Sequence, residues 1–112
     1  MLNSTTATRG MAVAPHSLAA QAALSVLSRD GGNAIEAMIA AASTIAVVYP
    51  HMNGIGGDGF WVISEPNQAV IAVEGCGSAG ASVSRDFYLK KKLESIPVRG
   101  PLAANTLAGT IG

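Results

Sequence analysis

The residues between Asn33 and Pro50 form the feature that most constrains the fold, a stretch with helical periodicity and almost no charge. Asn33 followed by Glu36 is an Asx variant of the capping box, and Pro50 disfavours helical backbone at the residue before it. These signals predict a helix that is capped by Asn33 and runs to Tyr49. A helix that is apolar all round is buried on all sides, so we expect this one to lie inside a packed layer of something larger than the chain. Its apolar residues are Ile35, Met38, Ile39, Ala42, Ile45, Ala46 and Tyr49 on one side, and Ala37, Ala40, Ala41, Val47 and Val48 on the other.

The composition favours the same conclusion. Of the 112 residues, 49% are hydrophobic and only 12% are charged, whereas soluble domains usually contain about 25% charged residues. Either the chain enters a membrane, or protein outside this sequence covers most of its surface. The longest nearly uncharged apolar stretch, residues 37–49, is well short of the roughly 20 residues of a spanning helix. The net charge is zero and the only basic run is Lys90 to Lys92, so neither a membrane nor a nucleic acid is an expected partner.

The remaining pattern predicts a β-hairpin and two further helices. The first helix begins at His16 or Ser17 and ends at Gly31-Gly32, because glycine can take the left-handed conformation that closes a last turn. Strands are predicted at 60–64 and 69–74, with a turn at 65–68 between them. Both strands are apolar on both faces, so we expect the sheet to be covered on both sides. The last helix begins at Ser82 or Ser84 and ends at about Ser95. The apolar stripe of the first helix consists of Leu18, Ala22, Ala23, Leu24, Val26 and Leu27.

Two candidate binding motifs have simpler structural explanations. Gly54, Gly56 and Gly59 have the spacing of a dinucleotide-binding loop, but that fingerprint requires the order strand, loop, helix. Here a helix precedes the loop and a strand follows it, so close backbone packing under a buried sheet is the preferred explanation. A metal site would have to combine His16, His51 and Asp58, which share no ligand-type spacing. A histidine that is hydrogen-bonded at the boundary of an element is the preferred interpretation.

The candidate nucleophiles are Cys76, Thr106 and Thr110. Gly75 and Gly77 leave the Cys76 thiol accessible, but no histidine lies near it in sequence, which favours a free thiol. A threonine hydroxyl becomes a practical nucleophile mainly when its own free amine acts as the base, so it must be the first residue of a chain. Because Met1 is the first residue, no threonine qualifies unless cleavage occurs directly before it.

The N-terminal residues 1–6 lack both the basic region and the apolar region of a signal peptide. A single cysteine cannot form an internal disulfide, which agrees with a reducing compartment. If the start is native, we expect a cytoplasmic protein.

Several motifs in the same order resemble the start of the gamma-glutamyltransferase family. The resemblance extends from Arg9 to Gly112, and the form of residues 50–59 resembles the oxamate amidohydrolase branch of that family. The motifs are His16-Ser17-Leu18-Ala19-Ala20, Gly31-Gly32-Asn33-Ala34-Ile35-Glu36-Ala37, Val47-Val48-Tyr49-Pro50-His51, Gly54-Ile55-Gly56-Gly57-Asp58-Gly59-Phe60, Gly100-Pro101-Leu102 and Ala108-Gly109-Thr110.

The resemblance implies an α+β fold in which this chain is part of an αββα N-terminal-nucleophile hydrolase sandwich. It implies a precursor that cleaves itself, with residues 1–112 as the N-terminal segment of the large subunit and not a complete independent domain. The catalytic threonine begins the small subunit, so no catalytic residue is expected in this chain. That threonine attacks an amide, and water or an acceptor amine resolves the acyl-enzyme. The implied partners are the rest of the large subunit, the small subunit and a small-molecule amide, with no cofactor and no metal.

Cys76 departs from the family pattern. In family members that act on glutathione, an arginine after a strand like 69–74 holds the α-carboxylate of the substrate, a role that suits a bidentate guanidinium. Cys76 stands at that position, and no arginine occurs from Glu74 to Ser84. The departure predicts weak binding of gamma-glutamyl donors, so the substrate is either a small amide such as oxamate or a gamma-glutamyl compound. The alternative is a stand-alone interaction or ligand-binding module without catalysis, in which residues 54–59 hold the ligand.

Overall fold

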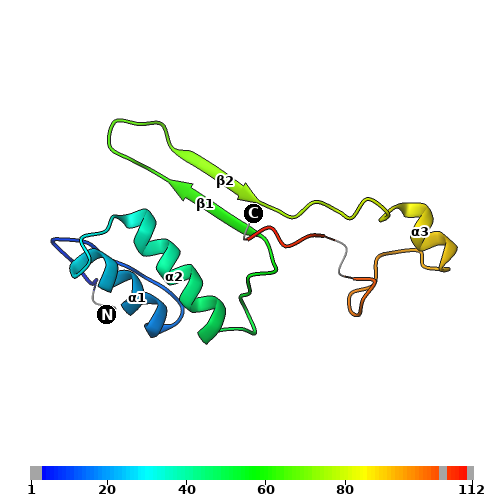
Figure 1. Ribbon diagram of the computed structural model, residues 1–112, viewed down its shortest axis with the longest axis horizontal. Helices are drawn as coiled ribbons and strands as arrows, with labels where there is room; N and C mark the ends of the chain where they lie inside the picture. Colours follow the sequence, from blue (N-terminus) through cyan, green and yellow to red (C-terminus); the bar gives the residue numbers. More distant parts are fainter. Residues whose placement is uncertain (1–3, 104–105, 111–112) are drawn as a thin grey trace. The chain divides into compact units, whose positions relative to one another are not determined.

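A computed structural model of the chain describes residues 4–103 and 106–110. The chain divides into two compact units, residues 1–54 and 55–112. The first unit contains helices α1 (Ser17–Ser28) and α2 (Ala34–Val48). The second contains strands β1 (Gly59–Ile63) and β2 (Ile71–Gly75) and helix α3 (Arg85–Lys90) (Figure 1). The predicted order of two helices, a hairpin and a helix is therefore confirmed, whereas the sequence predictions that concern residues 1–3 and 111–112 lie outside the described residues.

Helix α1 has the predicted boundaries at both ends. The Nδ1 atom of His16 accepts a hydrogen bond from the Leu18 amide at 3.2 Å, which satisfies one of the amides that a helix leaves unpaired at its start. At the other end Gly31 has a φ of +68°, the left-handed conformation that the sequence analysis expected. The Gly32 amide then donates to the Val26 carbonyl at 3.0 Å.

Helix α2 is held at its start by the predicted capping box. The Oδ1 atom of Asn33 accepts from the amides of Ile35 and Glu36 at 2.9 and 3.0 Å, and the Oε2 atom of Glu36 accepts from the Asn33 amide at 2.8 Å. The helix ends with Tyr49 as its C-cap, directly before Pro50. Both boundaries agree with the prediction.

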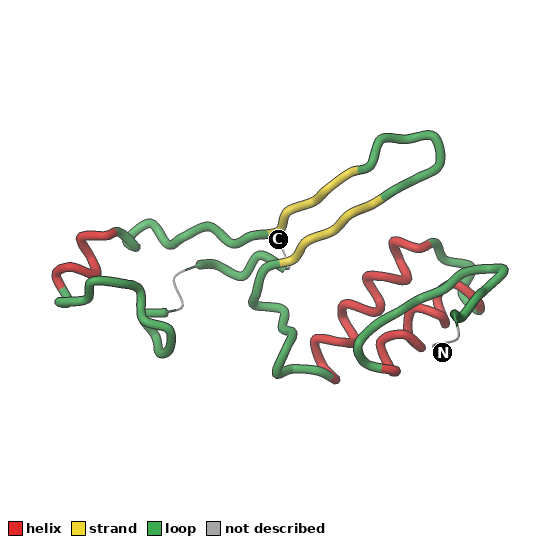
Figure 2. The backbone as a smooth tube through the Cα atoms, turned by 180° about the vertical axis from the view of Figure 1, so that it is seen from behind, coloured by secondary structure: helices red, strands yellow, loops and turns green. Residues whose placement is uncertain are grey.

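Helices α1 and α2 lie side by side and pack through alanines (Figures 1 and 2). Ala19 and Ala23 of α1 and Ala37 and Ala41 of α2 form the buried cluster. Small side chains allow two helix backbones to approach closely. Of the predicted apolar stripe, Ala23 is buried and Val26 and Leu27 pack against this cluster. Leu18 and Leu24 are 49% and 41% exposed, because α1 turns its alanine positions, four residues apart, towards α2.

Apolar residues from both sides of α2 remain uncovered within the described residues. Ile35, Met38, Ile39 and Val47 are all exposed, from 37% for Ile35 to 76% for Val47. Burial of α2 on all sides therefore stays a prediction that requires protein outside this chain. No helix in residues 4–103 and 106–110 is long and apolar enough to cross a membrane.

Strands β1 and β2 form an antiparallel hairpin, with pairs from Gly59 with Gly75 to Ile63 with Ile71 (Figure 2). In the connection Asn67 has a φ of +60°, and the Gln68 amide donates to the Glu65 carbonyl at 3.2 Å, so the predicted turn is present. The second strand begins at Ile71 and not at Ala69, because residues 69 and 70 serve to return the chain from the turn.

The hairpin exposes apolar side chains within the described chain. Phe60 and Val62 are 68% and 78% exposed. Cover on both faces of the sheet is therefore also a prediction about protein outside the chain.

Helix α3 is shorter than predicted, because it ends at Lys90 and not near Ser95. Lys92 has a φ of +60°. Its amide donates to the Leu89 carbonyl at 2.9 Å, and the Leu93 amide donates to the Tyr88 carbonyl at 3.0 Å. These two bonds define a Schellman motif, which usually has glycine at the left-handed position. A lysine at this position concealed the helix end from the sequence pattern.

Other features of α3 match the sequence prediction. The Ser84 hydroxyl oxygen caps the helix by accepting from the Phe87 amide at 3.2 Å. Lys90, Lys91 and Lys92 are all exposed. The Lys91 ammonium lies 5.1 Å from the centre of the Phe87 ring, within the range of a cation–π contact.

Candidate functional site

The hairpin register brings the start of β1 and the end of β2 to the same end of the sheet, since Gly59 pairs with Gly75. Cys76 follows β2 directly. The segment 107–110 reaches the same place (Figure 1), where the amides of Gly109 and Thr110 donate to the Gly57 carbonyl at 3.1 and 2.9 Å. We name the three segments that meet there, residues 57–58, 75–78 and 107–110, the glycine junction.

At Gly75, Gly77 and Gly109 the backbones of the glycine junction are too close to each other for side chains. A Cβ atom on Gly109 would lie 2.8 Å from the carbonyl carbon of Cys76, and one on Gly77 would overlap the Leu107 carbonyl oxygen. The Leu107 amide also donates to the Ser78 carbonyl at 2.9 Å. Between Gly75 and Gly77, only Cys76 carries a side chain, and that side chain is exposed.

The surroundings of Cys76 keep its thiol protonated. Its Sγ atom donates to the Oε1 atom of Glu74 at 3.4 Å. Desolvation by the nearby chain, the hydrogen bond to Glu74 and the negative charges of Asp58 and Glu74 together raise the pKa of the thiol. A protonated thiol is a poor nucleophile, and the neighbouring charges are negative. The structure thus supports the free-thiol interpretation, and the charged groups that act on Cys76 among the described residues, Asp58 and Glu74, are both negative.

Asp58 links two parts of the glycine junction that are distant in sequence. Its Oδ1 atom accepts a hydrogen bond from the Gly77 amide at 3.3 Å. The sequence pattern indicates Asp58 only as a candidate metal ligand, and no group of three or more metal-ligating side chains occurs within the part of the chain that the structure describes. The hairpin register was the only sequence signal that could have indicated this contact.

Within the described residues close packing is present only at Gly59, at the end of the glycine-rich loop, and for the rest of the loop it stays a prediction. A Cβ atom on Gly59 would lie 3.5 Å from Thr110, but Gly54, Gly56 and Gly57 have no atom within 4 Å of such a position among the described residues. The predicted order of elements is confirmed, since α2 precedes the loop and β1 follows it. This order differs from that of the dinucleotide fingerprint.

The Tyr49 ring lies near the rings of both histidines. The ring centroids of His16 and Tyr49 are 6.4 Å apart, and those of Tyr49 and His51 are 4.2 Å apart. The prediction of a hydrogen-bonded boundary histidine is confirmed for His16, which caps α1. The contacts through Tyr49 were not predicted, because they depend on how α1 and α2 pack.

The two candidate threonines have structural contacts. The Thr110 hydroxyl donates to the Gly57 carbonyl at 2.7 Å, and Thr106 forms a β-bridge with Ala79. Both contacts help to hold the segment 106–110 against the end of the hairpin.

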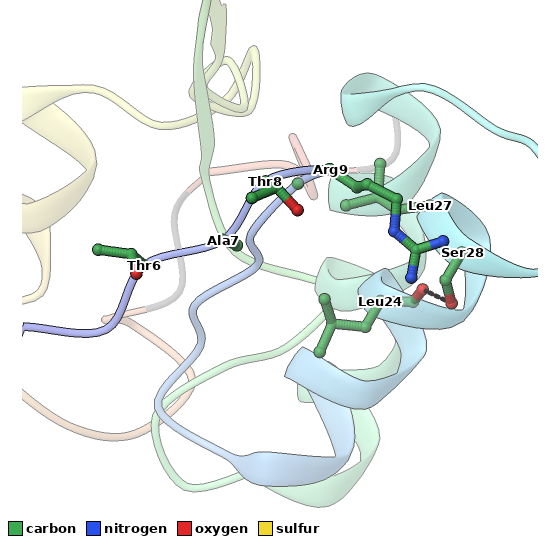
Figure 3. Close-up of a pocket in the computed structure, with 8 residues that line it drawn as sticks. Thr6, Ala7, Thr8, Arg9, Leu24, Leu27 and Ser28 are labelled. Atoms are coloured by element: carbon green, nitrogen blue, oxygen red, sulfur yellow. Dashed lines mark hydrogen bonds between the residues drawn. The ribbon is translucent and has the colours of Figure 1, made fainter.

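A separate hollow in the first unit lies between the N-terminal segment and the last turns of α1 (Figure 3). Arg9 extends its guanidinium over the C-terminal end of α1 (Figure 3), where positive charge is favourable. Among its described lining residues there is no carboxylate, histidine or thiol, so the hollow offers no acid–base or nucleophilic chemistry. The lining residues are Thr6, Ala7, Thr8, Arg9, Gly10, Leu24, Leu27 and Ser28.

Solved structures with this fold identify the class of protein. The crystal structure of Helicobacter pylori gamma-glutamyltranspeptidase matches with a TM-score of 0.83 and 31% identity, over 97% of this chain and 32% of that chain. The gamma-glutamyltranspeptidase from Pseudomonas nitroreducens complexed with L-DON matches with a TM-score of 0.79 and 31% identity, over 95% and 32% of the two chains. The chain thus has the predicted α+β class and is part of an N-terminal-nucleophile hydrolase fold.

Curated relatives and a family model specify the family. The oxamate amidohydrolase proenzyme of Klebsiella pneumoniae is 56% identical over 99% of this chain and 20% of that protein. The glutathione hydrolase-like YwrD proenzyme of Bacillus subtilis is 43% identical over 99% of this chain and 21% of that protein. The glutathione hydrolase proenzyme of Escherichia coli is 32% identical over 74% of this chain and 14% of that protein. The family model described as gamma-glutamyltranspeptidase matches residues 19–112.

The chain belongs to the gamma-glutamyltranspeptidase family. It spans about a fifth of the length of the curated relatives that match nearly all of it.

Proposed function

We propose that this chain is the N-terminal segment of the large subunit of an amide-cleaving N-terminal-nucleophile hydrolase that is made as a self-cleaving precursor. The catalytic threonine begins the small subunit, outside this chain. It attacks the amide carbonyl while its own amine takes the proton, and water or an acceptor amine then resolves the acyl-enzyme. The family membership, and the word proenzyme in the names of the relatives, support this arrangement.

The proposed substrate is a small amide such as oxamate, and the observation that carries this proposal is the surroundings of Cys76. A gamma-glutamyl donor has its α-carboxylate at the far end of an aliphatic chain from the scissile amide, so it needs a cationic group at a distance from the nucleophile. The carboxylate of oxamate is bonded directly to the amide carbonyl carbon and needs no such distant group. Cys76 offers a neutral thiol beside the negative charges of Glu74 and Asp58.

A gamma-glutamyl compound is the second candidate substrate. The identity of 43% to the glutathione hydrolase-like YwrD proenzyme favours it, whereas the identity of 56% to the oxamate amidohydrolase proenzyme favours oxamate. The proposed partners are the rest of the large subunit and the small subunit. The exposed thiol of Cys76 agrees with a cytoplasmic location, where thiols are kept reduced.

The complete enzyme tests both candidates. We expect it to release ammonia from oxamate and to hydrolyse glutathione poorly. Turnover of glutathione at rates that exceed those for oxamate would reject oxamate as the preferred substrate.

The variant Cys76→Arg tests the role of position 76 directly. A guanidinium can form two charge-assisted hydrogen bonds with a carboxylate, so we expect the KM for glutathione to fall about tenfold. Cys76→Met is the matched control, because it lengthens the side chain without a charge. An equal effect of the two variants on glutathione hydrolysis would show that position 76 does not contact the donor carboxylate.

A further inference from the structure

We propose that Asp58 is a positioning residue of the substrate site: through the Gly77 amide, it holds the backbone on which Cys76 is presented. The inference rests on the proposed function, because it assumes that Cys76 faces the substrate. Asp58 itself needs no contact with the substrate for this role.

The hydrogen bond from the Gly77 amide to the Asp58 Oδ1 atom joins residues that are 19 positions apart. Among the described residues, no other side chain forms a hydrogen bond between the loop before β1 and the segment 75–78. Since Cys76 directly precedes Gly77, a shift of this amide would move the Cys76 side chain as well.

The backbone on both sides of Asp58 is held in place. The preceding residue, Gly57, accepts three hydrogen bonds at its carbonyl: two from the amides of Gly109 and Thr110 and one from the Thr110 hydroxyl at 2.7 Å. The following residue, Gly59, begins β1 and pairs with Gly75. Asp58 therefore extends from a backbone that is fixed on both sides.

Gly77 has little room to move towards the segment 107–110. A Cβ atom at this residue would overlap the Leu107 carbonyl oxygen, and a Cβ atom on Gly109 would lie 2.5 Å from the Gly77 nitrogen. The Gly77 amide thus contacts two segments: it donates to Asp58 in the loop before β1, and it lies against the segment 107–110. Without Asp58 the segment 75–78 loses its direct hydrogen bond to the loop before β1.

Substitutions in the complete precursor test this role. Asp58→Ala removes the hydrogen-bond acceptor, while Asp58→Asn keeps an acceptor oxygen and removes the charge. Asp30→Ala is the matched control, since Asp30 is an exposed carboxylate in the other unit. Hydrogen–deuterium exchange of the peptide that contains Gly77 and steady-state kinetics with oxamate are the two measurements.

For Asp58→Ala we expect exchange at Gly77 to become about tenfold faster and the KM for oxamate to rise about tenfold, with kcat changed less than KM. Asp58→Asn should restore both values to near those of the unchanged enzyme, and Asp30→Ala should change neither. If Asp58→Ala does not fold, Asp58→Ser replaces it, because a serine side chain is too short to reach the Gly77 amide.

Two results would overturn the inference. One is unchanged exchange at Gly77 in Asp58→Ala; the other is equal impairment of the Ala and Asn variants, which would assign the effect to charge alone. Failure of the proposed function looks different, because the unsubstituted enzyme would then act on neither oxamate nor glutathione. In that case the exchange at Gly77 still decides whether Asp58 holds the segment.

Discussion

Residues in the glycine junction differ in the space around them. Gly77 and Gly109 lie against neighbouring backbone, whereas Gly57 is open. The sequence showed all of these residues as similar small positions. The sequence could not show which of these glycines are crowded, because the contacts come from segments about 20 to 50 residues away along the chain. Only the hairpin register brings these segments together.

Replacement of Gly77 by alanine should destabilise the protein strongly, since the added Cβ would overlap the Leu107 carbonyl oxygen. Overpacking of this kind typically costs about 1–3 kcal/mol. Gly56→Ala is the matched control and should leave the stability of the complete enzyme within about 0.5 kcal/mol. Denaturant midpoints of the two variants provide the measurement, and similar midpoints would contradict the close approach at Gly77.

The thiol of Cys76 should react slowly with iodoacetamide at neutral pH, because its raised pKa leaves little of the reactive thiolate. Glu74→Gln removes a negative charge and a carboxylate acceptor, so the pH midpoint of alkylation should fall and the rate at pH 8 should rise several-fold. The mass of the peptide that contains Cys76, followed over time and pH, reports the rate. Glu65→Gln, in the hairpin connection, is the control and should leave the pH midpoint unchanged.

Helix termini show what a local sequence pattern can predict about an element. The capping box at Asn33 and Glu36 and the left-handed Gly31 follow from residues within one turn of each other, and both were predicted. The end of α3 was not, because its left-handed residue is Lys92 and not glycine. The buried side of α1 was predicted only in part, since it depends on the packing of α2 against Ala19 and Ala23.

Lys92→Gly should stabilise the end of α3. A residue other than glycine in the left-handed conformation costs roughly 1–2 kcal/mol, and the bonds that the Lys92 and Leu93 amides donate need no side chain at position 92. We expect a gain of about 1 kcal/mol in the free energy of unfolding. Lys91→Gly is the control, because Lys91 has a φ of −88° and glycine brings no advantage there. A loss of stability in Lys92→Gly would contradict the motif.

The molecule as a whole has few buried side chains and many exposed apolar ones. The buried hydrophobic residues in the described chain are four alanines and Tyr88. Val47, Phe60 and Val62 are more than two-thirds exposed. The sequence composition indicated this imbalance, and the family membership gives it a cause, since the chain spans about a fifth of its relatives. The identity of the covering segments could not be predicted, because they lie outside the chain.

The segment expressed alone should not form a stable soluble monomer. Its buried side chains are too small to supply the apolar burial that a domain of this length requires. We expect aggregation, or strong binding of a dye that reports exposed apolar surface, and no cooperative unfolding. The complete precursor is the control and should unfold cooperatively. A soluble, cooperatively unfolding monomer of the segment would favour the stand-alone binding module.

The glycine junction has a consequence for how substrate preference can change over generations. Its three segments are joined by backbone atoms and by Asp58 and Thr110, so the scaffold does not depend on which side chain occupies position 76. Both codons for cysteine become arginine codons by exchange of their first base. A single point mutation can therefore place a guanidinium at position 76 of an intact scaffold, and the reverse mutation can remove one.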